Sequence, residues 1–115
     1  MEKAVKESEI KITVGLNSEN VPVSMHWQAD DNPESQVPQA CKAMILALFD
    51  KESLDTLRID LWTKDMMVNE MDRFFFQTLR AMADTYYRAT QNVELANEMQ
   101  RFVQYFGEKT EIIPK

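Results

Sequence analysis

Few residues of this chain could support acid–base or metal chemistry, and they are scattered along it. His26 is the one histidine, and the nearest acids, Asp30 and Asp31, follow it in a polar segment. A metal site usually needs three or four ligands at characteristic spacing, and a Ser-His-Asp triad needs its members in mutual contact. The pattern is instead typical of a solvated histidine on a strand. We therefore expect no catalytic residue, no bound metal, no cofactor and no enzyme activity.

Two carboxylates flank Trp62 and are the second candidate for chemistry. Paired carboxylates act as acid and base when a pocket separates their pKa values. The spacing here favours a simpler interpretation, in which Arg58 and Asp60 form a surface ion pair and Asp65 stands at the entrance of a helix. Cys41, the single cysteine, lies among apolar residues, which is typical of an inert buried thiol.

Length, charge and hydropathy limit the class of protein. At 115 residues the chain predicts a single domain over 1–115, with tails at 1–7 and 108–115. A net charge of −6 argues against nucleic acid and against anionic membrane surfaces as partners. The longest apolar run, 43–49, is too short to cross a bilayer. Residues 1–9 lack the apolar stretch of a signal peptide, so we expect a cytoplasmic protein without direct membrane insertion.

The first two strands are predicted from alternation. Apolar and polar residues alternate over 8–16 and again over 21–28, which indicates an antiparallel hairpin. Pro22 cannot donate to a ladder, so we expect it at a strand start or an unpaired edge. Residues 29–39 contain two prolines and clustered acids and are predicted as a loop.

Two further strands are expected in the middle of the chain. Residues 40–49 fit a helix by composition, but a short polar connection joins them to the alternating segment 54–63. We interpret both segments as strands of a second hairpin. In the latter strand Leu57, Ile59 and Leu61 are expected to face the core.

A long amphipathic helix is predicted over 68–89, with Phe75 on its main apolar stripe. Three consecutive helical positions cannot share one stripe. We therefore expect Phe74 or Phe76 to point to a second helix or to a partner.

A second helix is expected after Asn92, its predicted N-cap, with Gly107 as its C-terminal stop. A sheet with one apolar face must bury that face, and the helices are its partners within the chain. The predicted fold is therefore α+β, with a four-stranded antiparallel sheet followed by two helices packed on one face.

Some outward residues of these elements are too apolar for a free surface. As a strand, residues 40–49 are apolar on both faces. Trp62 lies on the other face of its strand from Leu57 and Ile59. An uncovered apolar face usually marks an interface, so we expect a protein partner or client, or self-association into a homo-oligomer. The predicted partner surface consists of Arg58, Asp60, Trp62, Met44, Phe74 and Phe76.

Several short segments, taken in order, resemble one family. TLRIDLWTKDM (residues 56–66) and MADTYYRAT (82–90), with SEIK (8–11) and KAM (42–44), are similar to segments of the gliding-motility-associated protein C family (GldC) of Bacteroidetes-type bacteria. The resemblance extends over 8–106. It implies a soluble cytoplasmic accessory protein of surface gliding, and it supplies no catalytic or ligand residue.

The predicted architecture is also similar to that of the SecB export chaperone, in which sheets and helices form a tetramer with apolar client grooves. These observations leave three functions open. The first is a non-enzymatic accessory protein of gliding motility that acts through protein–protein contacts. The second is a SecB-like holding chaperone for unfolded secretory clients, and the third is a small enzyme that uses His26 with Asp60.

Overall fold

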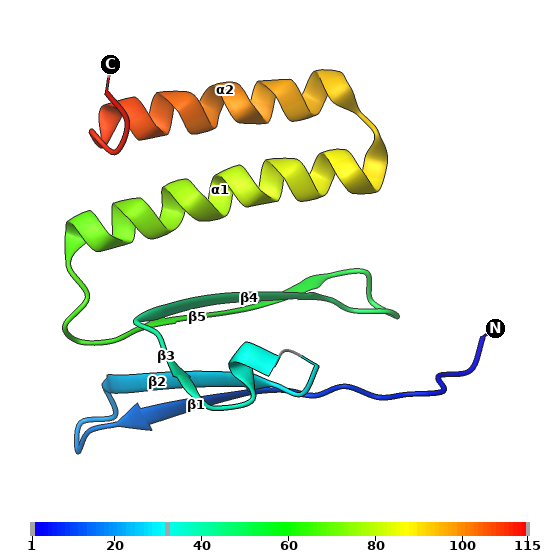
Figure 1. Ribbon diagram of the computed structural model, residues 1–115. Coiled ribbons are helices and arrows are strands. Elements are labelled where there is room, and N and C mark those ends of the chain that lie inside the picture. Colours follow the sequence, from blue (N-terminus) through cyan, green and yellow to red (C-terminus); the bar gives the residue numbers. More distant parts are fainter. Residues whose placement is uncertain (1, 32, 115) are drawn as a thin grey trace. The chain divides into compact units, whose positions relative to one another are not determined.

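The computed structural model describes residues 2–31 and 33–114. The chain forms two compact units, Met1–Met66 and Met67–Lys115. The first unit carries the strands and the second carries two helices (Figure 1), which confirms an α+β protein. The interpretation of 1–115 as a single domain stays a prediction.

The first unit begins with an antiparallel hairpin of β1 (Ile10–Leu16) and β2 (Pro22–Ala29). The Asn17 side chain closes the turn between them. Its Oδ1 accepts hydrogen bonds from the backbone N–H of Glu19 at 2.8 Å and of Val21 at 3.0 Å. Asparagine is common in turns because its side chain can replace a backbone acceptor in this way.

The hairpin follows the predicted alternation. Pro22 begins β2, as expected for a residue that has no N–H to donate. Val14 pairs with Met25, so both side chains lie on the apolar face of the hairpin. Met25 is buried, with 1 % of its surface exposed, and is the largest fully buried side chain among the described residues.

The strands divide into two sheets. A short strand, β3 (Gln39–Ala40), pairs with β2 and completes a three-stranded sheet in the order β1-β2-β3. The 3₁₀ turn η1 (Pro33–Ser35) precedes it, within the segment predicted as a loop. The second sheet has two antiparallel strands, β4 (Ala43–Phe49) and β5 (Thr56–Trp62).

The prediction of one four-stranded sheet is therefore wrong, and the division falls inside segment 40–49. The Cys41 N–H donates to the Met25 C=O at 2.9 Å, so the chain is still bonded to β2 there. One residue later the Lys42 C=O accepts from the Thr63 N–H at 2.8 Å. Because the chain exchanges one neighbour for the other across this bend, no single ladder joins all the strands. Packing of the helices on one sheet face stays a prediction.

The connection between β4 and β5 is a six-residue loop, 50–55, held by the side chain of Asp50. Its carboxylate accepts N–H hydrogen bonds from Ser53 at 2.8 Å and Glu52 at 3.1 Å. These bonds, with that from Ser53 the stronger, hold the pKa of Asp50 below its usual value. Leu54 then takes a left-handed φ of 62° with its side chain exposed. This conformation costs a residue with a Cβ about 1–2 kcal/mol.

Leu54→Gly is expected to raise the free energy of unfolding by roughly 0.5–1 kcal/mol, because glycine reaches a positive φ without a Cβ clash. Thermal unfolding followed by circular dichroism measures the change. Leu57→Gly is the matched control, since glycine within β5 lowers stability. A Leu54→Gly variant no more stable than the wild type contradicts the argument for strain at this turn.

The second unit is a helical pair, α1 (Val68–Thr90) and α2 (Val93–Lys109), and both helices are predicted by the apolar periodicity. Asn92 is the N-cap of α2, as predicted, and its Oδ1 accepts from the Leu95 N–H at 3.0 Å. Gln91 ends α1 with a left-handed φ of 60°. Within the described residues, no helix combines the length and apolar content that a membrane crossing requires.

Gly107 does not end α2, contrary to prediction, because the helix continues to Lys109. The glycine serves close packing instead of a left-handed cap. A Cβ at this position would lie 2.6 Å from Cε1 of Phe76 and still closer to the Ile113 side chain. The buried residues of the pair are small apart from one ring: Phe76, Ala83, Ala96, Val103 and Gly107.

The most buried positions of α1 differ in part from the predicted stripe. The expectation that Phe74 or Phe76 points to a second helix is confirmed for Phe76. Phe76 is 8 % exposed, whereas Phe75, the residue predicted on the main stripe, is 40 % exposed. Phe76 and Ala83 stand two helical turns apart on the face toward α2. The absence of a side chain at Gly107 makes room for the Phe76 ring. The periodicity of α1 alone does not predict that this ring is the buried one.

Candidate functional site

The register of β4 and β5 gives their hairpin two distinct faces. Residues directly opposite each other in an antiparallel pair share a face, and alternate residues change face. The Trp62 face consists of Ala43, Ile45, Ala47, Phe49, Thr56, Arg58, Asp60 and Trp62. The Met44 face consists of Met44, Leu46, Leu48, Leu57, Ile59 and Leu61.

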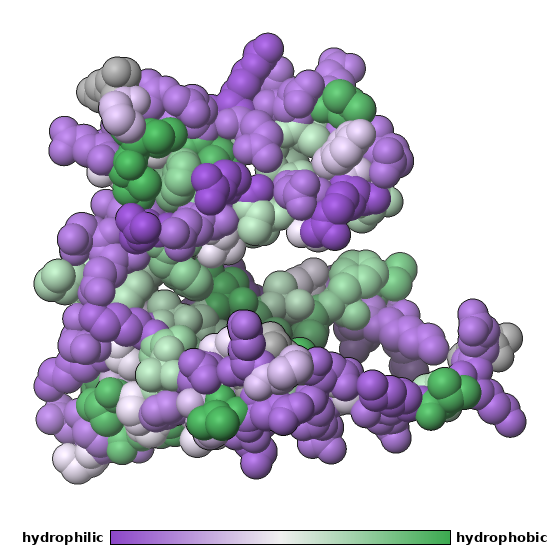
Figure 2. All heavy atoms as spheres, in the orientation of Figure 1, coloured by the Kyte–Doolittle hydropathy of each residue, from purple (hydrophilic) through white to green (hydrophobic). Residues whose placement is uncertain are grey.

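Both faces of this hairpin leave large apolar side chains exposed. On the Trp62 face, Phe49 is 69 % and Trp62 is 54 % exposed. On the Met44 face, Leu48, Leu57 and Ile59 are exposed as well. Figure 2 shows apolar atoms gathered over β4 and β5 on the side in view. A face with several exposed apolar side chains is typical of an interaction site.

The charges on the Trp62 face neutralise each other. Arg58 Nε lies 2.7 Å from Asp60 Oδ2, which confirms the predicted surface ion pair. Both side chains are largely in solvent, so the pair contributes little to stability. The ion pair matters for binding, because it leaves the Trp62 face without net charge although the chain as a whole carries −6. An approaching partner therefore meets an apolar surface with one compensated polar pair.

A shallow hollow of about 400 Å³ and another of about 320 Å³ lie in this unit. The second adjoins Trp62 and is lined by Val21, Pro22, Asp60, Leu61, Trp62 and Lys64. A hydrogen bond from the Lys64 N–H to the Pro22 C=O, at 2.9 Å, fixes its two sides. The hollow can accept an apolar side chain of a partner beside the indole ring.

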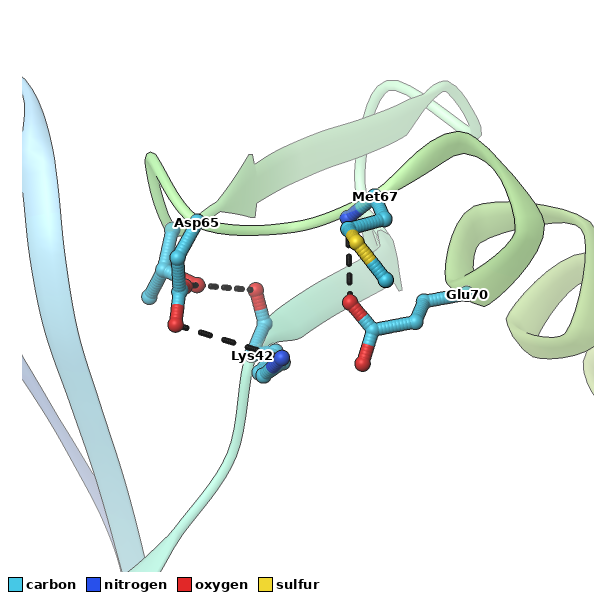
Figure 3. A network of polar contacts seen from close by, with 5 residues as sticks. Lys42, Asp65, Met67 and Glu70 are labelled. Carbon is cyan, nitrogen blue, oxygen red and sulfur yellow. Dashed lines mark hydrogen bonds and ion pairs between the residues drawn. The ribbon is translucent and has the colours of Figure 1, made fainter.

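A polar clamp holds the end of β5 next to Trp62. The buried Thr63 hydroxyl donates to Asp65 Oδ1 at 2.6 Å, and Lys42 Nζ lies 3.9 Å from Asp65 Oδ2 (Figure 3). The Thr63 hydrogen bond first, and the Lys42 charge second, hold the pKa of Asp65 below its usual value. The contact therefore stabilises the fold above the usual carboxyl pKa and is lost as the pH falls through the lowered one.

Within the first unit, the structure brings three of the predicted partner residues onto one face of the hairpin and puts a fourth on the other face. Arg58, Asp60 and Trp62 share one face, whereas the register places Met44 on the opposite face. Phe76 is buried against α2 and is not available to a partner. Phe74 is half-buried on α1, where its ring meets Phe75 edge to face at 6.1 Å.

Sequence reasoning missed two members of the Trp62 face, Ile45 and Phe49. They join it because Ile45 pairs with Asp60 and Phe49 with Thr56. They could have been predicted from the register between β4 and β5, which decides whether odd- or even-numbered residues of β4 share the face of Trp62. That register depends on how many residues the turn holds.

His26 lies on the polar face of β2, opposite Thr13, and is exposed. It borders the larger hollow with Cys41 and Asp65, whereas Asp60 borders the other one. Over residues 2–31 and 33–114, no three histidine, cysteine or acidic side chains gather closely enough to hold a metal ion. Cys41 is half-buried, and burial raises the pKa of its thiol, which disfavours the reactive thiolate.

These features define an α+β protein with two helices and two small antiparallel sheets. The chain belongs to the GldC-like family, whose model, described as gliding motility-associated protein GldC-like, matches residues 22–112. The match confirms the resemblance carried by segments 56–66 and 82–90, and the family is associated with gliding motility. No curated protein and no solved structure matches the chain significantly.

Proposed function

We propose that this protein is a non-enzymatic cytoplasmic accessory protein of bacterial gliding motility that acts by binding another protein through its Trp62 face. Membership of the GldC-like family supports the link to gliding. The observation that carries the binding proposal is an exposed Trp62 between a neutral ion pair and an open hollow.

Binding through such a face is favourable mainly because water leaves its apolar surface. Tryptophan dominates the energy of many interfaces, where it inserts into a partner surrounded by weaker contacts. Trp62 has the apolar residues Ala43 and Ile45 beside it on β4 and can serve as this anchor. Arg58 and Asp60 supply polar groups at the side of the anchor, where they can fix the orientation of the partner.

Trp62→Ala is expected to weaken partner binding about thirtyfold, the equivalent of a 2 kcal/mol hot spot. The measurement is affinity capture from the native bacterium with tagged wild-type and variant chains, followed by quantitative mass spectrometry. Proteins enriched by the wild type should be depleted with Trp62→Ala.

Tyr105→Ala is the matched control, since Tyr105 is an equally exposed aromatic residue on α2. It should retain the proteins that the wild type captures. Recovery of the same proteins, in the same amounts, with Trp62→Ala shows that the Trp62 face is not the binding surface. Circular dichroism of both variants checks that each remains folded.

A second function, a holding chaperone for unfolded clients, is favoured by one further feature. A hollow of about 260 Å³ in the first unit is lined almost wholly by apolar side chains, among them Ile12, Trp27 and Met44. Suppression of the aggregation of a chemically unfolded protein by the purified chain would favour this function over the first. A chain that binds defined folded partners and leaves aggregation unchanged favours the accessory role.

A further inference from the structure

The outer edge of β1 is a feature that the proposed partner face does not use. Strand order β1-β2-β3 gives β1 a hydrogen-bonded neighbour on one side. Its seven residues, Ile10–Leu16, contain no proline and a single charge, Lys11. Natural proteins usually protect such an edge with prolines, several charges or a covering segment, because it can pair with another strand.

The direction in which each backbone group of β1 points follows from one hydrogen bond. The Asp30 N–H donates to the Glu9 C=O at 3.2 Å, so Glu9 points its backbone toward β2. Backbone direction alternates along an antiparallel strand. Lys11 and Thr13 therefore also face β2, whereas the N–H and C=O groups of Ile10 and Ile12 face outward. The register of β1 with β2 shifts between Gly15 and Leu16, but the Asn17 N–H donates to the Val21 C=O at 3.0 Å, so Leu16 also faces outward. Four residues of β1 therefore present such groups: Ile10, Ile12, Val14 and Leu16.

We propose that this edge pairs with the β1 edge of a second copy of the chain, antiparallel and centred on Thr13. This register sets Ile10 opposite Leu16 and Ile12 opposite Val14, so every outward backbone group of the strand gains a partner. Thr13 then lies opposite its own copy. The two three-stranded sheets become one continuous six-stranded sheet.

The side chains of β1 suit this self-pairing. Lys11 lies opposite Gly15 of the second copy, so the one charge of the strand meets no like charge, although each chain carries a net charge of −6. Ile10 is 74 % exposed in the single chain, and Leu16, its partner across the edge, is exposed too. Ile10 and Ile12 also line the apolar hollow beside Met44, so pairing extends an apolar face that already exists.

The register makes a sharp prediction for cross-linking. Thr13 is a non-hydrogen-bonded pair with its copy, and such pairs place their Cα atoms about 4.5 Å apart, within the range of a disulfide. Thr13→Cys should therefore form a disulfide-linked dimer under mild oxidation. Lys11→Cys is the matched control, since two residues at position 11 would stand about 14 Å apart along the strands.

The experiment compares both variants of the 115-residue chain with the wild type, and all three retain Cys41. Lys11 and Thr13 are both exposed on the same face of β1, so both variants should fold alike. Thr13→Cys should cross-link at least roughly tenfold faster than Lys11→Cys, because only its sulfur atoms reach disulfide geometry.

Light scattering on the reduced wild-type chain completes the test. We expect twice the chain mass of 13.4 kDa. A chain that stays monomeric at tens of micromolar, or equal cross-linking rates at positions 11 and 13, overturns the proposal. Neither outcome bears on the Trp62 face, which lies on β4 and β5.

Discussion

Phe76→Ala is expected to lower the free energy of unfolding by about 3–5 kcal/mol, the range for removing a buried phenylalanine. Among the buried residues of α1 and α2 that the structure describes, Phe76 is the large apolar side chain and the others are smaller. Its neighbours on α2 include Gly107, which has no side chain to move into the vacated space. The cavity should therefore remain largely open. Urea unfolding followed by the helical circular dichroism signal measures the loss.

Phe75→Ala is the control for this substitution. It removes the same kind of ring from the preceding position of α1, where the side chain is 40 % exposed. We expect a loss below about 1 kcal/mol, since most of the cavity term is absent at a partly solvated site. Equal losses from both variants would contradict the assignment of Phe76, and not Phe75, to the helix interface.

Gly107→Val is expected to lower the free energy of unfolding by about 1–3 kcal/mol through overpacking. Helix propensity alone predicts the opposite sign, because valine favours a helix interior more than glycine does. The steric term dominates, since a Cβ here meets the Phe76 ring at 2.6 Å and the Ile113 side chain closer still. Thermal unfolding of the variant distinguishes the two signs.

A second substitution separates steric pressure from other causes. Ile113→Ala removes one of the two groups that the new side chain would strike. In this background Gly107→Val should be less destabilising than in the wild type, which a double-mutant cycle detects. A Gly107→Val variant more stable than the wild type would contradict the steric argument, because helix propensity would then outweigh overpacking.

The helices could be predicted from the sequence because their determinants are local. Apolar spacing over 68–89 and the Asn92 cap are sufficient to place both. What local patterns could not supply was which one of Phe74, Phe75 and Phe76 is the buried ring. That choice depends on Gly107, which lies thirty-one positions along the chain and acts by the space it leaves.

The positions of the strands along the sequence were predicted well, but their assembly into one sheet was wrong. Alternation locates β1, β2 and β5 within a few residues, but it carries no information about which strand pairs with which. The division between the sheets depends on Cys41 and Lys42, which bond to different neighbours. Nothing in the apolar run 40–49 marks that bend.

The candidate site was predicted in part for the same reason. Arg58, Asp60 and Trp62 share a face because they alternate within a single strand. Assigning Met44 to that face requires the register between two strands, and the register puts it opposite Leu61 instead. A shift of one residue in the register of β4 against β5 would therefore change which β4 side chains share the face of Trp62.

Photo-cross-linking in living cells tests most directly whether the Trp62 face binds another protein. A photoreactive amino acid replaces Arg58 on that face or, as the matched control, Arg101 on α2. Each of these arginines is exposed and pairs with one acid of its own element, Asp60 or Glu98. We predict a discrete adduct with another protein from position 58 and none from position 101. No adduct at position 58, or the same adducts from both positions, would contradict binding through the Trp62 face.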